Sequence, residues 1–246
     1  MFVYQEEGRF AAQVAGGVEE IAADEIFALG GESVQHGFRV VTFAASPEAL
    51  MRIVYRASLP ARILAPLARF GCHDGKYLRR RAGDVDWTSL MTVDETFAVR
   101  ANVGNSSISH SQFAALCVKD AVVDQFRAKM KRRPSVEKID PDVWFHVHVD
   151  NDRATLALDL GCGALHRRGY RRQALEAPLT ETLAAAMLRM AEWKGDRPLL
   201  DPMCGAGTIL AEALMLAGEI PAGFLRKRFG FPRLPEFREE EWKRVR

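Results

Sequence analysis

Apolar and polar positions follow two different periods along the first sixty residues. Residues 10–14 alternate as a strand does, and apolar side chains then recur at helical spacing over 18–29 before two glycines. Residues 32–36 and 38–44 alternate again and predict a hairpin that turns near Gly37. The segment therefore begins with the order strand, helix, strand, strand.

A second helix and a fourth strand complete this first segment. Ser46 is a good N-cap, and Pro47 suits the first helical position. An apolar strand is expected at 61–67. The order β-α-β-β-α-β is typical of a ferredoxin-like unit, which we place at 1–67.

Residues 68–168 predict a second α/β segment. The expected elements are a short helical turn that residues 84–87 lead into, a strand at 96–103, a long helix at 111–132 that Pro134 ends, and a hairpin of strands at 143–149 and 153–160. The apolar positions expected to form the buried stripe of the long helix are Leu116, Val122, Val123, Phe126 and Met130.

Residues 169–246 change pattern once more. The expected elements are a helix at 177–194 with Pro178 near its start, a short strand at 198–200, a tight loop at 201–207, and a helix at 208–216 that Gly218 ends. A strand, a glycine-containing turn and a helix in succession are typical of a doubly wound sheet. The fold class predicted for the whole chain is α/β, with an α+β N-terminal part.

The loop at 201–207 has the composition of a ligand-binding turn. Gly205 and Gly207 let the backbone approach a ligand, and the amides that open the next helix favour an anionic group. A P-loop would need lysine after the second glycine, and a dinucleotide turn would need a small residue where Leu210 stands. An S-adenosylmethionine turn with Asp201 at the strand end remains, and an ordinary tight turn is its alternative. Cys204 is a small loop residue rather than a nucleophile, since no histidine is near it in sequence.

Charge is distributed unevenly, although the formal net charge is only +2. Residues 1–50 contain two basic and eight acidic residues, a balance of −6, so residues 51–246 carry +8. Such a distribution fits a protein that meets a polyanion with part of its surface.

Other classes of protein are disfavoured by the composition. No apolar run approaches the roughly 20 residues of a membrane span, and no signal peptide opens the chain, so we expect a cytoplasmic protein. The four cysteines form no CxxC pair and are expected to be reduced thiols. His146 and His148 share a predicted strand face with Trp144 but have no third ligand, so we expect no metal.

Four segments resemble one known family, the THUMP-containing RNA guanine-N2 methyltransferases. Asp201–Ala213 resembles their cofactor motif, Leu165–Arg171 the joint between their two main domains, and Ala177–Ala185 the helix beside the cofactor. Val118–Asp124 resembles the long helix of a THUMP domain. The similarity covers essentially the whole chain and is greatest to the bacterial type that modifies large-subunit (23S) ribosomal RNA.

The resemblance implies domains and a cofactor. It implies a THUMP RNA-binding domain at 68–168 and the N-terminal part of a Rossmann-like methyltransferase domain at 169–246. S-adenosyl-L-methionine is the implied cofactor. The residues expected to contact it are Pro178, Thr180, Asp201, Pro202, Met203, Cys204, Gly205, Gly207 and Thr208.

The resemblance assigns no catalytic residue in this chain. The family's Asn-Pro-Pro-Tyr segment and the acidic residue that holds the cofactor ribose are absent from the sequence. Gly161 and Cys162 also replace the family's frequent Ser-Gly before Leu165. We therefore expect a C-terminally truncated form that alone is inactive and binds the cofactor weakly or not at all.

Three basic clusters could contact RNA phosphates. The cluster of Lys129, Lys131, Arg132 and Arg133 ends the long helix, where cations that offset the helix dipole are an equal alternative. The other two clusters are the expected RNA contacts. They comprise Lys76, Arg79, Arg80 and Arg81 around Tyr77, and Arg167, Arg168, Arg171 and Arg172 around Tyr170. A solvated surface is the alternative for each. The function expected from the resemblance is methylation of guanine N2 in 23S ribosomal RNA, with a transfer-RNA guanine-N2 enzyme and a non-catalytic RNA-binding protein as alternatives.

Overall fold

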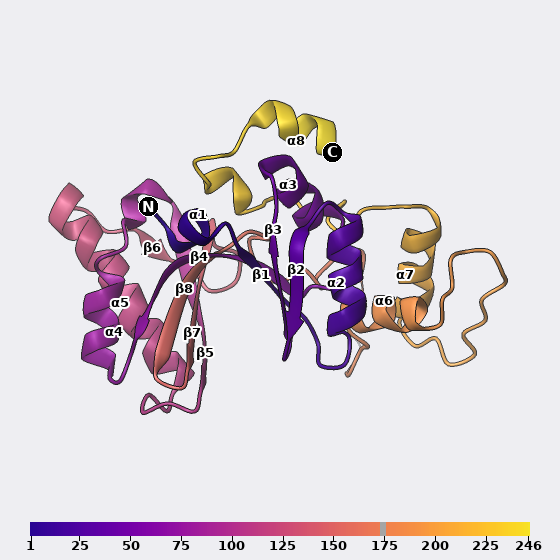
Figure 1. Ribbon diagram of the computed structural model, residues 1–246, viewed down its shortest axis with the longest axis horizontal. Helices are drawn as coiled ribbons and strands as arrows, with labels where there is room; N and C mark the ends of the chain where they lie inside the picture. The colour runs from indigo at the N-terminus through magenta and orange to yellow at the C-terminus, as the bar shows by residue number, and fades with distance from the viewer. Residues whose placement is uncertain (173–175) are drawn as a thin grey trace. The chain divides into compact units, whose positions relative to one another are not determined.

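The computed structural model describes residues 1–172 and 176–246. Its elements divide between two compact units, each assembled from three stretches of the chain (Figure 1). Unit 1 consists of Met1–Arg9, Leu64–Cys162 and Gly230–Phe237, and unit 2 of Phe10–Ile63, Gly163–Phe229 and Arg238–Arg246. The mixed helices and strands of both units confirm the predicted α/β class.

The N-terminal part of unit 2 has the predicted ferredoxin-like order. Its elements are β1 (Phe10–Gln13), α2 (Glu19–Ala28), β2 (Glu32–Gly37), β3 (Val40–Ala44) and α3 (Pro47–Arg56), followed by the start of β4 (Arg62–Gly71). β3 pairs antiparallel with both β1 and β2. The Ser46 hydroxyl accepts a hydrogen bond from the amide of Ala49 (3.3 Å), so the predicted cap of α3 is confirmed.

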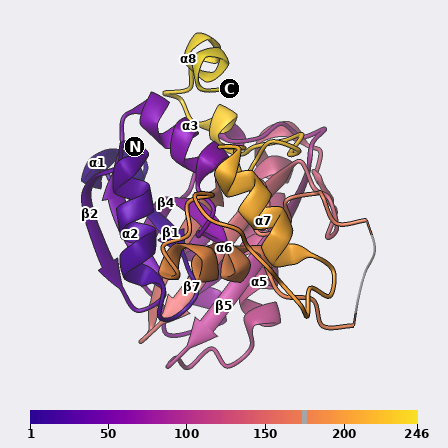
Figure 2. The ribbon, with the colours of Figure 1, turned by 90° about the vertical axis from the view of Figure 1, so that its right-hand side faces the viewer.

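The C-terminal part of unit 2 is helical. Its helices are α6 (Glu181–Met190), α7 (Thr208–Ala217) and α8 (Glu239–Val245). α6 and α7 pack side by side (Figures 1 and 2), and α8 packs on α3, where Trp242 contacts Tyr55 edge to face. The helix predicted at 177–194 is shorter, because Pro178 and Leu179 precede its first turn. The strand predicted at 198–200 is wrong: these residues are in no helix or strand.

Unit 1 is built on a mixed sheet. Its strands are β4, β5 (Thr96–Gly104), β6 (Ser135–Val136), β7 (Val143–Asp150) and β8 (Arg153–Asp159). β8 pairs antiparallel with β4 and β7, while β5 runs parallel to β7 and β6. The hairpin of β7 and β8 is confirmed, and Asn151 and Asp152 adopt the positive φ values of a tight turn.

The remaining elements of unit 1 are helical. They are α1 (Val3–Glu7), α4 (Gly75–Ala82), α5 (Ser111–Met130) and the 3₁₀ turns η1 (Trp87–Ser89) and η2 (Phe231–Arg233). α5 packs on β5 and β7. Figure 1 shows α4 and α5 side by side along the strands. Val122, Val123 and Phe126 are buried as predicted, but Leu116 and Met130 are 49% and 42% exposed. The buried face of α5 instead includes Cys117, Val118 and Ala121.

The segment Gly230–Phe237 packs in unit 1, although the residues on both sides of it belong to unit 2. Phe231 is buried, and Arg233 binds Glu95 (2.7 Å). Glu236 accepts hydrogen bonds from Tyr4 (2.8 Å) and Gln5 (2.6 Å). Hydrophobic burial and polar contacts therefore fix this short segment at both ends.

Candidate functional site

The loop that precedes α7 is bent by two glycines in the left-handed region. Gly205 has φ +51° and Gly207 has φ +70°. The Gly207 amide donates to the Cys204 carbonyl (2.7 Å), which closes the turn. A β-carbon on Gly207 would meet no atom within 4 Å, and Met203 is 89% exposed. The predicted turn exists, and its outer face is open.

This open turn fits the amino-acid end of S-adenosylmethionine. α7 begins at Thr208 without a side-chain cap, and a helix N-terminus with uncapped amides favours a carboxylate. Asp201 lies in the same loop, where its carboxylate accepts a hydrogen bond from the Met203 amide (3.2 Å). Pro202 and Cys204 are exposed beside it. The residues of this bend could hold one end of the cofactor.

Arg171 connects the first residue of α7 to the segment that precedes α6. Its guanidinium donates to the Leu179 carbonyl (2.9 Å) and to the Thr208 hydroxyl (3.2 Å), and it lies 3.4 Å from the Glu181 carboxylate. Thr208 is 4% exposed, so its side chain fixes the loop, and its contact with a cofactor stays a prediction.

Arg168 forms the centre of a buried polar cluster behind the loop. Its side chain is 1% exposed and donates to the carbonyls of Leu165 (2.8 Å) and Ser58 (2.5 Å). Its Nε lies 3.4 Å from Glu212, a residue of α7, and the Tyr170 hydroxyl donates to the same carboxylate (2.9 Å). Arg168 therefore joins the ferredoxin-like segment to the helix that carries the glycine loop.

Burial dominates the electrostatics of this cluster. Removal from water raises the pKa of the Glu212 carboxyl, and Arg168 and Tyr170 oppose that effect only in part. Burial and the neighbouring carboxylate also raise the pKa of the Tyr170 phenol, which stays a hydrogen-bond donor. Both shifts describe a structural network, since the side chains of Arg168 and Glu212 are only 1% and 3% exposed.

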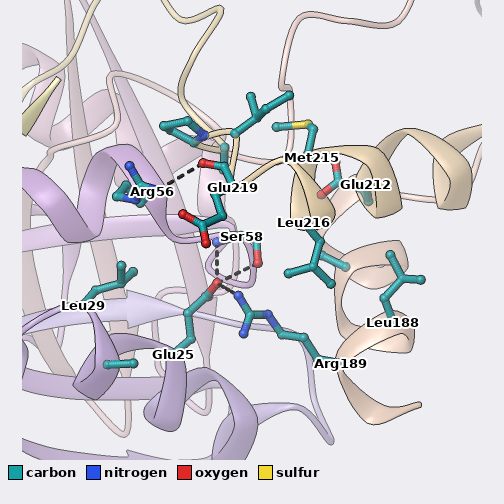
Figure 3. A pocket seen from close by; sticks show the side chains of 15 residues that line it. Glu25, Leu29, Arg56, Ser58, Leu188, Arg189, Glu212, Met215, Leu216 and Glu219 are labelled. Carbon is teal, nitrogen blue, oxygen red and sulfur yellow. Dashed lines mark hydrogen bonds and ion pairs between the residues drawn. The ribbon is translucent and has the colours of Figure 1, made fainter. Parts of the chain in front are cut away.

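A second carboxylate, Glu25 of α2, connects the same parts of unit 2. It accepts hydrogen bonds from the Ser58 amide (2.9 Å), the Ser58 hydroxyl (2.6 Å) and the Leu59 amide (2.9 Å), and it binds Arg189 of α6 at 2.6 Å. Figure 3 shows these groups at the edge of a cavity of about 220 Å³ between α2, α6 and α7. The roles of Glu25 and Glu212 could not be predicted from the sequence, since the pattern around a single glutamate on a helix does not show that it is buried.

Pro178 and Thr180, the two cofactor contacts predicted ahead of the loop, are both exposed. Pro178 is exposed and precedes α6, and Thr180 is the exposed N-cap of that helix, without a side-chain capping bond. Their contact with a cofactor stays a prediction.

The joint arginines separate into two groups. Arg167 and Arg172 are exposed, whereas Arg168 is buried and Arg171 is largely engaged with protein atoms. A side chain that is 1% exposed cannot reach a phosphate, so the structure contradicts the expected RNA contact for Arg168. Sequence alone could not separate neighbouring arginines in an irregular segment.

The basic cluster of unit 1 lies on α4. Asp74 caps this helix by accepting from the Tyr77 amide (2.7 Å), and Lys76, Arg79 and Arg80 are exposed. Arg80 stacks over the Tyr77 ring at 4.7 Å. These side chains flank an open groove between α4 and α5, although Arg79 also binds Asp124 of α5. Arg81 is only partly exposed and binds Asp84 (2.6 Å).

Two further observations concern metals and membranes. Within residues 1–172 and 176–246, no three His, Cys, Asp or Glu side chains converge as a metal site requires. None of the helices in those ranges combines the length and the apolar character of a membrane span.

The fold and this loop define a class of protein: an α/β chain in which a ferredoxin-like segment precedes a methyltransferase-type glycine turn. Models of three known domain families match the chain in that order. They are an RlmL ferredoxin-like domain at residues 9–64, a THUMP domain at 75–159 and an RMKL-like methyltransferase domain at 168–246.

Curated relatives agree with these matches. A ribosomal RNA large subunit methyltransferase K/L of Syntrophotalea carbinolica is 43% identical over 238 residues, which is 95% of this chain and 33% of that protein. The protein of the same name from Aliivibrio salmonicida is 37% identical over 97% of this chain and 34% of its own length. The chain therefore contains matches to a ferredoxin-like, a THUMP and a methyltransferase domain, and it spans about a third of the length of the curated relatives it matches.

Solved structures share the fold across nearly the whole chain. A protein of Listeria monocytogenes predicted to be an N6-adenine-specific DNA methylase superposes with a TM-score of 0.80 at 26% identity, covering 97% of this chain and 62% of that one. SMU.472, assigned as a methyltransferase and crystallised with SAH, has a TM-score of 0.78 at 26% identity, covering 96% and 62%. TrmN from Thermus thermophilus has a TM-score of 0.66 at 27% identity, covering 85% and 62%.

Proposed function

We propose that this chain supplies the RNA-recognition part and the first cofactor turn of an S-adenosylmethionine-dependent methyltransferase that modifies guanine N2 in 23S ribosomal RNA. Its domains are a ferredoxin-like domain at 1–67, a THUMP domain at 68–168 and methyltransferase sequence at 169–246. The observation that carries the proposal is the open bend at Gly205 and Gly207, directly before an uncapped helix.

The relatives support the cofactor and the substrate class. The K/L proteins are named for ribosomal RNA methylation, and SMU.472 was crystallised with SAH, the product form of the methyl donor. The Listeria protein is named for DNA instead, but its identity to this chain is lower. RNA is therefore the better-supported polymer, and guanine N2 follows from the family resemblance.

In this arrangement the residues of the chain bind and orient. The bend from Asp201 to Gly207 would hold the amino-acid end of S-adenosylmethionine, which supplies the transferred methyl group. Lys76, Arg79, Arg80, Arg167 and Arg172 offer exposed positive charge for RNA phosphates. No residue of this chain is given a catalytic role.

Binding measurements on the chain as it stands test both parts. RNA affinity, measured by fluorescence anisotropy across a salt series, is expected to fall as salt rises, and the salt slope should flatten when Arg167 and Arg172 become alanine. A variant with Arg9→Ala and Arg39→Ala, changed in the acidic first fifty residues, is the charge-matched control. Calorimetry should show weak or no binding of S-adenosylmethionine, because the acidic residue that holds the cofactor ribose in the family is absent from this sequence. An unchanged salt slope would contradict the RNA assignment, and micromolar cofactor binding would contradict the second expectation.

A further inference from the structure

One edge of the unit 1 sheet is left open beside β5. β7 pairs with β5 from Phe97 to Gly104, whereas β6 pairs on the other side only with Thr96 and Phe97. In the part of the chain that the structure describes, no strand continues that pairing beyond Phe97. Ala98–Gly104 therefore lie next to β7 on one side and extend past the end of β6 on the other.

A groove of about 360 Å³ follows this edge, between β5 and α5. We call it the β5 groove; its chemically distinctive lining residues are Arg100, Leu116, Lys119, Val136, Lys138 and Trp144. Leu116 is 49% exposed and Val136 is 44% exposed, so their apolar surface faces the groove rather than the core. A cavity of this size is in the range of small-ligand sites.

The lining is basic and partly aromatic. Three side chains are cationic, and no carboxylate lines the groove among the described residues. Asp120 lies just outside it and pairs with Lys119 (2.5 Å), while Arg100 and Lys138 are exposed. Cations next to an aromatic ring and an apolar floor match a nucleotide, whose phosphate is anionic and whose base has an apolar face.

The shape selects single-stranded over double-stranded RNA. Trp144 can meet a base only when that base has left its stack, because side chains cannot read the narrow major groove of an RNA duplex. A peptide strand could also pair with the β5 edge, but the cationic lining favours an anionic chain. Charge complementarity thus decides between the two occupants.

We propose that the β5 groove binds one unstacked nucleotide of single-stranded RNA, with Trp144 contacting the base and Arg100, Lys119 and Lys138 the adjoining phosphates. This inference rests on the proposed RNA-binding function. It adds a site on the side of α5 away from the α4 cluster, since Ala115, Leu116 and Lys119 form one stripe of α5, and Ala121, Asp124 and Gln125 another. α5 would then lie between two RNA-contacting surfaces.

The test uses the whole chain and a fluorescently labelled single-stranded oligoribonucleotide, with a duplex of the same sequence for comparison. Trp144→Ala is expected to weaken single-strand binding about tenfold, the effect of losing one stacked base, and Trp144→Phe should retain most of it. Phe38→Ala removes an exposed aromatic from unit 2 and is the control. Photocrosslinking of RNA that contains 5-iodouridine should label a peptide that includes Trp144.

A charge reversal gives a second measure that does not depend on the tryptophan. Lys138→Glu should weaken binding and lower the salt slope, whereas Lys243→Glu, the same change on an exposed residue of α8, should do neither. Circular dichroism checks that each variant is folded; should Trp144→Ala unfold, Trp144→Phe and Lys138→Glu decide.

The outcomes separate this inference from the function on which it rests. If Lys76→Glu with Arg80→Glu weakens RNA binding while the Trp144 and Lys138 variants bind like the unaltered chain, the β5 groove inference is overturned and the proposed function stands. Equal affinity for the single strand and the duplex also overturns it. If the unaltered chain binds no RNA, the proposed function itself fails.

Discussion

The joint around Arg168 and the glycine loop at 201–207 both carry motifs of the same family, but they differ in burial and in the number of contacts that hold them. In the joint, Arg168 is buried and has several partners. The loop is exposed and is held mainly by one closing hydrogen bond and by Thr208 at its end. The difference shows that the same family motifs contain residues that build the scaffold and residues that remain available for a ligand.

This contrast gives a ranking of expected mutational effects. Substitutions of buried residues in the joint should lower the free energy of unfolding more than substitutions in the loop. Substitutions in the loop should weaken ligand binding even where they change the free energy of unfolding little. Four changes, from the largest expected effect to the smallest, examine that ranking.

Arg168→Ala should give the largest effect. It leaves the buried Glu212 carboxylate without its cation and two carbonyls without their donor, and removing one partner of a buried ion pair costs about 3–5 kcal/mol. Urea unfolding followed by circular dichroism measures the loss. The exposed neighbour Arg167→Ala should change the free energy of unfolding by less than about 0.5 kcal/mol. Equal effects at the two positions would remove the distinction between joint and surface.

Tyr170→Phe should give the next largest effect. It removes a hydrogen bond to the Glu212 carboxylate without opening a cavity, a loss of about 1.5–3 kcal/mol for a bond to a charged group. Hydrogen exchange of α7 amides, read by mass spectrometry, should increase. Tyr77→Phe in α4, where the ring contacts Arg80, is the matched control and should leave exchange in α7 unchanged.

Gly207→Ala should cost about 1–2 kcal/mol, because an alanine is strained at φ +70° although it would meet no atom within 4 Å. Gly71→Ala is a matched control: it too would meet no atom within 4 Å, and Gly71 does not have a positive φ. Thermal unfolding should therefore separate the two variants. A loss at Gly71 as large as that at Gly207 would mean that the bend is not strained in the expected way.

The pH dependence contributed by His166 should be the smallest effect. Burial lowers the pKa of this histidine below its ordinary value of about 6.5, so the folded chain takes up its proton less readily than the unfolded chain. Its stability contribution is present above pH 6.5 and is lost as the pH falls through that value towards the folded-state pKa. His166→Gln should flatten the unfolding free energy over this interval. The same slope in both proteins would contradict the assignment.

Much of the fold followed from local pattern. The period-2 and helical spacings located β1, α2, α3, α5 and the hairpin of β7 and β8, since one face of each element is buried. The strand expected at 198–200 is not formed. A short apolar run indicates that a segment can be buried, but it does not show that a neighbouring strand is there to pair with it. α4 was not predicted, since its basic residues conceal a buried face that consists only of Leu78 and Ala82.

The site was predictable to a smaller extent. Glycines at fixed spacing identified the bend, because its backbone requires positive φ. The buried network of Glu25, Ser58 and Arg168 could not be inferred, since these residues meet only after the chain has folded. Burial is a property of tertiary packing, and a glutamate in a helix has the same local sequence signature whether it faces water or an arginine.

The segment Gly230–Phe237 has a consequence for dissecting this protein. Because unit 1 includes it, and because Met1–Arg9 also belongs there, neither unit corresponds to one uninterrupted stretch of chain. A gene fragment cut at the ends of the THUMP match, residues 75–159, would lack Tyr4, Phe231 and Arg233 and would expose the surfaces they cover. Expression of isolated domains should therefore yield aggregation-prone material unless the excised pieces are rejoined by a designed linker.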